Sequence, residues 1–276
     1  WTSTNNLFYL IIFGYIGFAI AIGGILNITL SKKHKHWGRK TTQLMIGFFM
    51  IGFLGFIGNE NMQIEGFFFY VFSGIFAGAT LHYLIAKIAG PLYFGRAWCG
   101  GACWTAMVLD FLPWVKPKYP RNKKLGIIRY FHFFASLLLI VFLFYVLEYK
   151  ENDYPSKELV WMIIGNTIYY IIAISLAFGF KDNRAFCKYA CPIPVTQKLT
   201  AYFAVLKQKV NTEKCTECGL CEINCPMNIR ILQYAKEGKR ILSTECILCN
   251  TCADICPTNA IKTTSGFDFQ FKEYIN

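Results

Sequence analysis

Five long apolar stretches, separated by short polar segments, fill the first two thirds of the chain. They cover residues 7–30, 42–58, 67–94, 127–149 and 159–180. A helix needs about 20 apolar residues to cross the hydrocarbon core of a membrane, and the stretches are of that order. The second is the shortest and is rich in glycine, which membrane helices tolerate. The pattern therefore predicts an α-helical membrane protein with about five transmembrane helices.

Lysine and arginine are unevenly distributed between these stretches. Eighteen lie in residues 31–40, 95–129 and 181–210, whereas two lie in residues 59–66 and 149–158. Cytoplasmic loops are enriched in basic residues. The bias therefore predicts a multi-pass protein of a prokaryotic cytoplasmic (inner) membrane, with its N-terminus outside and its C-terminal part in the cytoplasm. Because the chain begins without a methionine, we expect further sequence before it.

The composition agrees with a membrane location, since 55% of the residues are hydrophobic and 16% are charged. The formal net charge of +12 would suit nucleic acid, but its distribution argues against that partner. Residues 1–210 carry a net +13, next to the membrane, whereas residues 211–276 carry a net −1. We therefore expect anionic lipid, and no nucleic acid, to be the partner of the basic residues.

The C-terminal part contains the spacing C-x2-C-x2-C-x3-C-P twice. The two runs are Cys215, Cys218, Cys221, Cys225 and Cys246, Cys249, Cys252, Cys256, each followed by proline. In such runs the first three cysteines ligate one 4Fe-4S cluster and the fourth ligates the other. The spacing predicts one cluster on Cys215, Cys218, Cys221 and Cys256, and a second on Cys246, Cys249, Cys252 and Cys225.

A disulfide framework or a zinc ribbon would explain these cysteines differently. The predicted cytoplasmic location disfavours disulfides, and zinc sites usually repeat as two cysteine pairs with a longer spacer. The motifs resemble those of bacterial two-cluster ferredoxins. The resemblance implies an α+β ferredoxin-like module over residues 211–265.

The remaining four cysteines form a second repeat. Arg96-Ala97-Trp98-Cys99-x3-Cys103 matches Arg184-Ala185-Phe186-Cys187-x3-Cys191, with 88 residues between equivalent positions. Each copy follows a predicted helical hairpin, so the duplication is expected to bring the two pairs together. Four facing thiolates would hold a third 4Fe-4S cluster. Redox-active dithiols, a copper or other thiophilic metal site, and inert buried thiols are the alternatives.

With both cysteine patterns in view, the chain resembles membrane polyferredoxins of the NapH and NosR type, and also the FixG and RdxA accessory proteins. The segment Cys187-Lys188-Tyr189-Ala190-Cys191-Pro192 keeps the C-x3-C-P pattern of these families, whereas Trp104 replaces the proline after Cys103. The five predicted spans differ from the four usual for NapH, and the flavin-binding domain of NosR is absent from this sequence.

The resemblance implies an electron-transfer subunit of a quinone-linked oxidoreductase complex, a quinol dehydrogenase membrane component with other redox subunits as partners. The FixG-like resemblance implies a different function, an accessory protein that reduces a metal or a maturation partner. Reduction of the clusters by a quinol would distinguish the first from the second.

Ionisable side chains within or near the apolar stretches are few, and burying them in lipid is costly unless they have a role. His82, Asp110 and His132 are candidates to bind a quinone or exchange its protons, whereas Lys87 can extend to the membrane surface. The two histidines could instead ligate a haem. At about 1.5 Å per residue, His82 lies roughly 18 Å from the end of its stretch and His132 about 7 Å from the start of the next. That offset argues against a single haem.

The sequence thus divides into four predicted segments. Residues 1–191 form a transmembrane domain with the two C-x3-C motifs at its cytoplasmic face. Residues 192–210 form an interfacial linker helix, because Leu199 and its apolar neighbours alternate there with lysines. Residues 211–265 form the ferredoxin module, and residues 266–276 form a tail.

Overall fold

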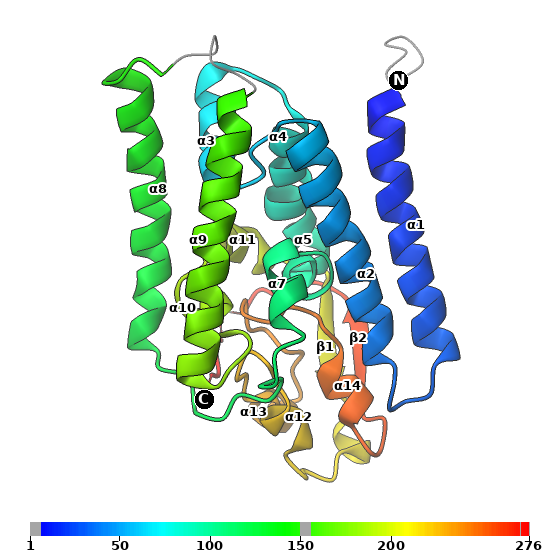
Figure 1. Cartoon of the computed structure of the whole chain (residues 1–276). Coiled ribbons are helices and arrows are strands. Elements are labelled where there is room, and N and C mark those ends of the chain that lie inside the picture. The colour runs from blue at the N-terminus through cyan, green and yellow to red at the C-terminus, as the bar shows by residue number, and fades with distance from the viewer. Residues whose placement is uncertain (1–6, 150–155, 271, 276) are drawn as a thin grey trace.

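The computed structural model describes residues 7–149, 156–270 and 272–275. Long helices form the upper part of the molecule in Figure 1, and the cysteine-rich C-terminal segment lies at their lower end. We call these the helical part and the ferredoxin part. The predicted outer N-terminus (residues 1–6) and Lys150 of a predicted outer loop lie outside the described residues.

Four helices among the described residues are long and apolar enough to cross a membrane. They are α1 (Leu7–Thr29), α2 (His36–Phe49) continued by the π-helix η1 (Met50–Ile57), the 3-10 turn η3 (Lys124–Ile127) continued by α8 (Ile128–Tyr145), and α9 (Ser156–Phe180). Large apolar side chains cover much of their outer surface, such as Ile28 (83% exposed) and Phe131 (77% exposed). Such a surface is expected of helices that contact lipid.

The third predicted stretch, residues 67–94, is not one helix. It forms α3 (Ile64–Ser73) and a second run made of α4 (Gly78–His82), the π-helix η2 (Tyr83–Ala89) and α5 (Gly90–Phe94). The two runs are bent by 114° relative to each other. The prediction of a single helix here is wrong. The described residues contain four candidate spans, or five if the bent pair counts as one.

The break between α3 and α4 has a local cause. Gly74 ends α3 with φ at 68°, a left-handed conformation that glycine adopts without a side-chain clash. The buried Glu60 accepts hydrogen bonds from the backbone N–H groups of Gly78 (3.1 Å) and Ala79 (2.6 Å), where α4 begins. A carboxylate there satisfies amides that a membrane interior would leave without partners.

The N-terminus of α3 lies deep in the helical part. Its first-turn residue Glu65 contacts Ser136 and Tyr169, which lie near the middle of α8 and α9. In Figure 1, α3 rises from there toward the upper end, and the chain then returns through α4. Short helices that begin inside a membrane often face ligand sites, because their first N–H groups have no intrahelical acceptor.

Four short helices lie where the two helical hairpins end. They are α6 (Ala97–Gly101), α7 (Trp104–Leu109), α10 (Ala185–Tyr189) and α11 (Ile193–Ala201). The first two follow α5, and the last two follow α9. Each cysteine pair of the second repeat therefore lies directly after a helical hairpin.

The ferredoxin part is small and contains a two-stranded antiparallel sheet. Its strands are β1 (Leu206–Val210) and β2 (Ile261–Ser265), and its short helices are η5 (Thr212–Lys214), α12 (Leu220–Ile223), α13 (Ile231–Lys236) and α14 (Thr251–Ile255). Leu206 pairs with Ser265 and Val210 with Ile261. The helix predicted for residues 192–210 therefore stops at Ala201, because the following residues find a strand partner more than fifty positions later.

The segment predicted as a tail packs onto the ferredoxin part. Asp268 forms an ion pair with Arg240 at 2.6 Å, and Ile275 forms an isolated β-bridge with Ile229. The last described residues thus complete the ferredoxin part.

Candidate metal centres

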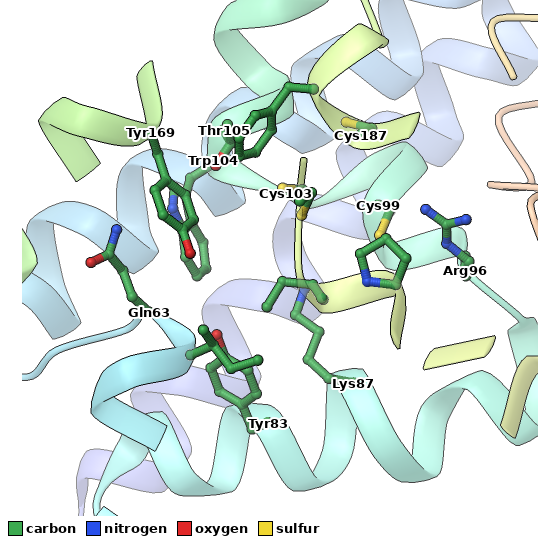
Figure 2. A pocket seen from close by; sticks show the side chains of 15 residues that line it. Gln63, Tyr83, Lys87, Arg96, Cys99, Cys103, Trp104, Thr105, Tyr169 and Cys187 are labelled. Carbon is green, nitrogen blue, oxygen red and sulfur yellow. The ribbon is translucent and has the colours of Figure 1, made fainter. Parts of the chain in front are cut away.

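Four cysteines from the second repeat line one pocket at the base of the helical part. Cys99 lies on α6, Cys103 precedes α7, Cys187 lies on α10 and Cys191 follows it. Figure 2 shows Cys99, Cys103 and Cys187 around the upper part of this pocket, with Tyr83 and Gln63 at its other end. We call it the membrane pocket.

The two halves of the repeat have the same local structure. Arg96 and Arg184 each precede a five-residue helix, and the first cysteine of each pair lies on that helix. Cys99 and Cys187 are both 8% exposed. Because each hairpin delivers an equivalent turn, the duplication places four thiols around one space.

The thiols of the second pair are poorly suited to act as a reactive dithiol. Burial raises the pKa of Cys187 to about 11 and raises that of Cys191 well above its usual value. A reactive thiol needs a lowered pKa and access to solvent. Metal ligation, which removes the thiol proton outright, suits such buried cysteines better.

Arg184 lies against the membrane pocket and links its two halves. It donates to the Cys99 carbonyl oxygen (2.9 Å) and to Asp110 (2.7 Å), and its Nη1 lies 3.9 Å from the Cys187 Sγ. Arg39 contacts the same Asp110 oxygen at 2.5 Å. Burial alone would raise the pKa of Asp110, but Arg184 and Arg39 lower it below its usual value. Asp110 is therefore an ionised anchor for two arginines.

A single carboxylate joins the helical part to the ferredoxin part. Glu245 contacts Arg96 (2.6 Å), Arg121 (3.1 Å), Arg129 (2.9 Å) and Lys198 (2.6 Å). It is 0% exposed, and its pKa lies well below its usual value because these cations, led by Arg96, outweigh the effect of burial. Since Glu245 directly precedes Cys246, the contact fixes a cysteine loop of the ferredoxin part against the membrane pocket.

Positive charge exceeds negative charge in this buried region. Seven cationic side chains contact three carboxylates: Arg39 and Arg184 on Asp110, Lys188 on Asp182, and Arg96, Arg121, Arg129 and Lys198 on Glu245. The Nε and Nη2 atoms of Arg96 and the Nε of Arg184 are buried without a hydrogen-bond partner among the described residues. Buried cations are costly without counter-charge. The donor set therefore fits an anionic, thiolate-ligated iron–sulfur cluster.

The ferredoxin part has two further cysteine-lined pockets. One is lined by Cys225, Cys246, Cys249 and Cys252, and the other by Cys215, Cys218, Cys221 and Cys256. Each pocket takes three cysteines from one run and the fourth from the other run. The two pockets thus collect the same groups of four that the spacing predicts.

The two cysteine loops share an unusual backbone. Glu217 and Leu248, two residues after the first cysteine, have φ of 51° and 48°, and Gly219 and Asn250 have φ of 74° and 59°. Left-handed residues other than glycine cost roughly 1–2 kcal/mol each. Alternating right-handed and left-handed residues turn successive N–H groups toward one side, where they can face cluster sulfur.

The fourth cysteine of each run also has a repeated contact. The Ile229 N–H lies 3.5 Å from the Cys225 Sγ, and the Ala260 N–H lies 3.3 Å from the Cys256 Sγ. Amide hydrogen bonds to ligand sulfur stabilise the thiolate and influence the reduction potential. Both ferredoxin pockets therefore fit 4Fe-4S clusters.

A site for one metal ion is not formed. No three His, Cys, Asp or Glu side chains within residues 7–149, 156–270 and 272–275 converge closely enough to hold a single ion. A cluster binds each thiolate to a separate iron atom, so its cysteine ligands need not converge on one point.

His82 and Lys87 both face tryptophans beside the membrane pocket. The His82 ring centroid lies 5.0 Å from that of Trp98 and 5.8 Å from that of Trp104. Lys87 is 2% exposed and lies over the same two rings. The expectation that Lys87 reaches the membrane surface is wrong, because its ammonium group is buried against aromatic faces.

His132 contacts Tyr169, which lines the pocket. Its Nδ1 lies 2.7 Å from the Ala190 carbonyl oxygen, and its Nε2 lies 3.3 Å from the Tyr169 hydroxyl. Both ring nitrogens are therefore within hydrogen-bond distance of a protein oxygen.

Several residues of the site were not singled out from the sequence. Gln63, Tyr83 and Tyr169 line the membrane pocket, and the Gln63 Nε2 and Tyr83 hydroxyl have no hydrogen-bond partner among the described residues. Glu65 falls in a loop between two apolar stretches, and Glu245 stands between two polar residues, Ser243 and Thr244, and the second cysteine run. Arg96 and Arg184 stand at equivalent positions of the two repeats, and this was the one sequence feature that indicated buried charges.

Comparisons with known families agree with this arrangement. A family model described as a 4Fe-4S dicluster domain matches residues 207–257. A second, described as a 4Fe-4S binding domain, matches residues 67–127 and 167–211. These two segments contain the two halves of the arginine–cysteine repeat.

Proteins similar to this chain include two that are named ferredoxin-type proteins. The chain is 28% identical over 189 residues to an uncharacterized protein of Methanocaldococcus jannaschii, covering 66% of this chain and 70% of the relative. It is 27% identical over 266 residues to the methylamine utilization ferredoxin-type protein MauN of Methylorubrum extorquens, covering 87% and 93%. It is 23% identical over 211 residues to the ferredoxin-type protein NapH of Haemophilus influenzae, covering 69% and 68%. No solved structure matches the chain.

Helices apolar enough to span a membrane, above cysteine-lined pockets, define a ferredoxin-type protein that binds 4Fe-4S clusters and transfers electrons. The named relatives are all ferredoxin-type or electron transport proteins. Within this class, the chain is similar to the ferredoxin-type proteins NapH and MauN.

Proposed function

We propose that this chain is the membrane-bound electron-transfer subunit of a quinone-linked complex, with three 4Fe-4S clusters. The observation that carries the proposal is that three pockets are each lined by four cysteines, which accounts for all twelve. Two clusters would be held by the predicted ferredoxin ligands. The third would be held by Cys99, Cys103, Cys187 and Cys191.

When bound, a 4Fe-4S cluster accepts and donates one electron at a time. The residues around the membrane pocket would hold it and set its charge environment. Arg96 and Arg184 supply buried positive charge, which favours the more reduced, more negative state. Gln197 lies next to Cys99, with its amide 3.0 Å from the Sγ, and its Nε2 has no partner among the described residues. A rotated Gln197 amide would donate to the ligated sulfur.

The far end of the membrane pocket supports a quinone as the electron-exchange partner. Gln63 and Tyr83 are 4% and 2% exposed and each presents a donor without a partner among the described residues. Ile64, Trp104 and Phe186 add apolar surface to the lining. A mostly apolar pocket with a few convergent donors suits a flat ring with carbonyl oxygens. The other redox subunits of the complex would meet the ferredoxin part.

The proposed location is the cytoplasmic membrane, with the ferredoxin part on the cytoplasmic side. The basic residues that precede α2, surround the first cysteine pair and follow α9 all lie near the ferredoxin end of the spans. That distribution is typical of the cytoplasmic face.

Iron and labile sulfide analysis of the purified full chain tests the cluster number. We expect about twelve irons per chain, and about eight in the double variant Cys103→Ala/Cys191→Ala, because one of three clusters is lost. The double variant Cys215→Ala/Cys218→Ala is the matched control and should also lose about four irons. Eight irons in the unmodified chain, unchanged by the first double variant, would exclude the third cluster.

Stopped-flow mixing of the full chain with a menaquinol-type donor tests the quinone link. We expect bleaching of the cluster absorbance within turnover times, and no bleaching with the oxidised quinone. Clusters that dithionite reduces but quinol does not would favour an accessory role of the FixG kind.

A further inference from the structure

We propose that Tyr169, Glu65 and Glu158 form a proton path from the membrane pocket to the end of the helical part opposite the ferredoxin part. The inference rests on the proposed function, because it needs a donor in the pocket that releases protons. Oxidation of one hydroquinone to a quinone releases two electrons, which the bound clusters accept, and two protons, which this path accepts one at a time.

The path begins at the Tyr169 hydroxyl, which lines the membrane pocket together with the cysteines (Figure 2). This oxygen lies 3.3 Å from the His132 Nε2 and 3.5 Å from the Glu65 Oε1. Because the Ala190 carbonyl accepts from the Nδ1–H of His132, the His132 Nε2 is an acceptor. The single hydroxyl proton of Tyr169 can therefore turn toward His132 or toward Glu65.

Glu65 is the proton acceptor at the centre of the path. Its Oε1 accepts from the Ser136 hydroxyl at 2.5 Å, whereas its Oε2 is buried without a hydrogen-bond partner among the described residues. It lies in the first turn of α3, where the helix dipole favours a negative charge. A carboxylate halfway along the helical part, with one oxygen that accepts no hydrogen bond from the described residues, is costly if its role is only structural. We therefore assign Glu65 a role in proton transfer.

A small cavity continues the path beyond Glu65. It measures about 20 Å³, enough for one water molecule, and is lined by Glu65, Asn61, Tyr149 and Glu158 among apolar side chains of α3, α8 and α9. Glu158 is 3% exposed, in the first turn of α9, and its neighbour Lys157 is exposed. One water in the cavity would connect the two carboxylates.

The path begins near the middle of the helical part, at Tyr169, and ends at Glu158, near the end opposite the ferredoxin part. Tyr169 is eleven residues after Glu158 on the same helix, which corresponds to about 16 Å along the axis. The cysteines and the ferredoxin part lie at the other end of α9 (Figure 1). Electrons and protons from one donor would therefore leave in opposite directions, so turnover would separate charge across the membrane.

The decisive variant is Glu65→Gln, which keeps the size of the side chain and its acceptor oxygen but cannot take up a proton. The full, cluster-loaded chain is placed in liposomes that enclose a pH-sensitive dye, with orientation measured by protease access to the ferredoxin part. Menaquinol is added, and cluster bleaching and proton release are recorded together. Thr167→Ala is the matched control, because its hydroxyl lies on the exposed face of α9, donates to the Ile163 carbonyl oxygen and is no part of the path.

We expect the unmodified chain to release protons on the side of Glu158, and Glu65→Gln to slow quinol-driven bleaching about 100-fold, in the range of lost general base catalysis. Iron content, cluster potentials and dithionite reduction should not change. Infrared difference spectra of the unmodified chain should show a carboxyl group gaining a proton on reduction, and Glu65→Gln should lack that band. Thr167→Ala should keep both the rate and the band.

Two results would overturn the path and leave the quinone link intact: equal bleaching rates in Glu65→Gln and the unmodified chain, or proton release on the ferredoxin side. Failure of quinol to bleach the unmodified chain would instead overturn the quinone link, and the path with it. If Glu65→Gln does not retain its iron, Tyr169→Phe replaces it. That variant keeps the ring and removes the relaying hydroxyl, and bleaching at the unmodified rate would overturn the path.

Discussion

Glu245 offers the sharpest test of how the ferredoxin part is held. Glu245→Gln replaces one carboxylate oxygen with an NH2 group, which cannot accept a hydrogen bond from a cation. If the Oε2 is replaced, Arg96 loses its acceptor at 2.6 Å; if the Oε1 is replaced, the other cations lose theirs. Arg96, Arg121, Arg129 and Lys198 would then lose their shared counter-charge.

The expected cost follows from burial. Removing one partner of a buried ion pair typically costs about 3–5 kcal/mol, because the remaining charge is left uncompensated. Since Glu245 and Arg96 are both 0% exposed, solvent screening gives little relief. For a chain of this size each kcal/mol lowers Tm by about 2–4 °C, so we expect a decrease of roughly 10 °C.

Thermal unfolding of the cluster-loaded chain in detergent, followed by cluster absorbance at a fixed heating rate, measures this change. The control is Glu213→Gln, the same chemical change on an exposed residue of the ferredoxin part, which should leave Tm unchanged. A Tm for Glu245→Gln equal to that of Glu213→Gln would refute the role assigned to the buried carboxylate.

Two glycine pairs give further predictions. A Cβ on Gly100 would lie 2.1 Å from the Ile247 carbonyl oxygen, so Gly100→Ala should weaken docking of the ferredoxin part by about 1–3 kcal/mol. A Cβ on Gly101 meets nothing within 4 Å, so Gly101→Ala should not weaken docking. Hydrogen exchange of the loop around Ile247 compares the two variants. A Cβ on Gly165 would lie 2.0 Å from the Gln63 Oε1, so Gly165→Ala should displace Gln63 and raise the quinol concentration that gives half-maximal bleaching. Gly179 has open space around its Cβ position, so Gly179→Ala should leave that concentration unchanged. Equal behaviour within either pair would contradict the packing described for that position.

The sequence could predict the cysteine groups because ligand spacing is a local property. Each run fixes the path of its own loop, and the shared fourth ligand follows from the paired runs. The 88-residue repeat likewise predicts that Cys99 and Cys187 meet, since equivalent hairpins tend to pack together. Ligation of clusters by these cysteines stays a prediction until iron is measured.

The broken third stretch could not be predicted from hydropathy. A window average records the apolar character of residues 67–94 but not the turn at Gly74 or the caps that Glu60 supplies from a position eighteen residues before Gly78. The strand β1 was missed for a related reason. Its Lys-Gln-Lys core has weak strand propensity, and its partner β2 lies far along the chain.

Buried charge was the least predictable feature. Lys87 and Glu245 would be assigned to the surface by residue type alone. Their burial depends on partners from other elements, Trp98 and Trp104 for the first and four cations for the second. Asp110 was singled out as a candidate to bind a quinone or exchange its protons, and the sequence did not reveal its contacts with Arg39 and Arg184.

The central claim is that the repeated cysteines hold a third cluster beside the two of the ferredoxin part. An experimental structure of the full chain, purified without oxygen and measured at the iron absorption edge, tests it most directly. The account predicts three separate iron positions, one of them among Cys99, Cys103, Cys187 and Cys191. Anomalous density at the two ferredoxin pockets alone, with none among these four cysteines, would contradict it.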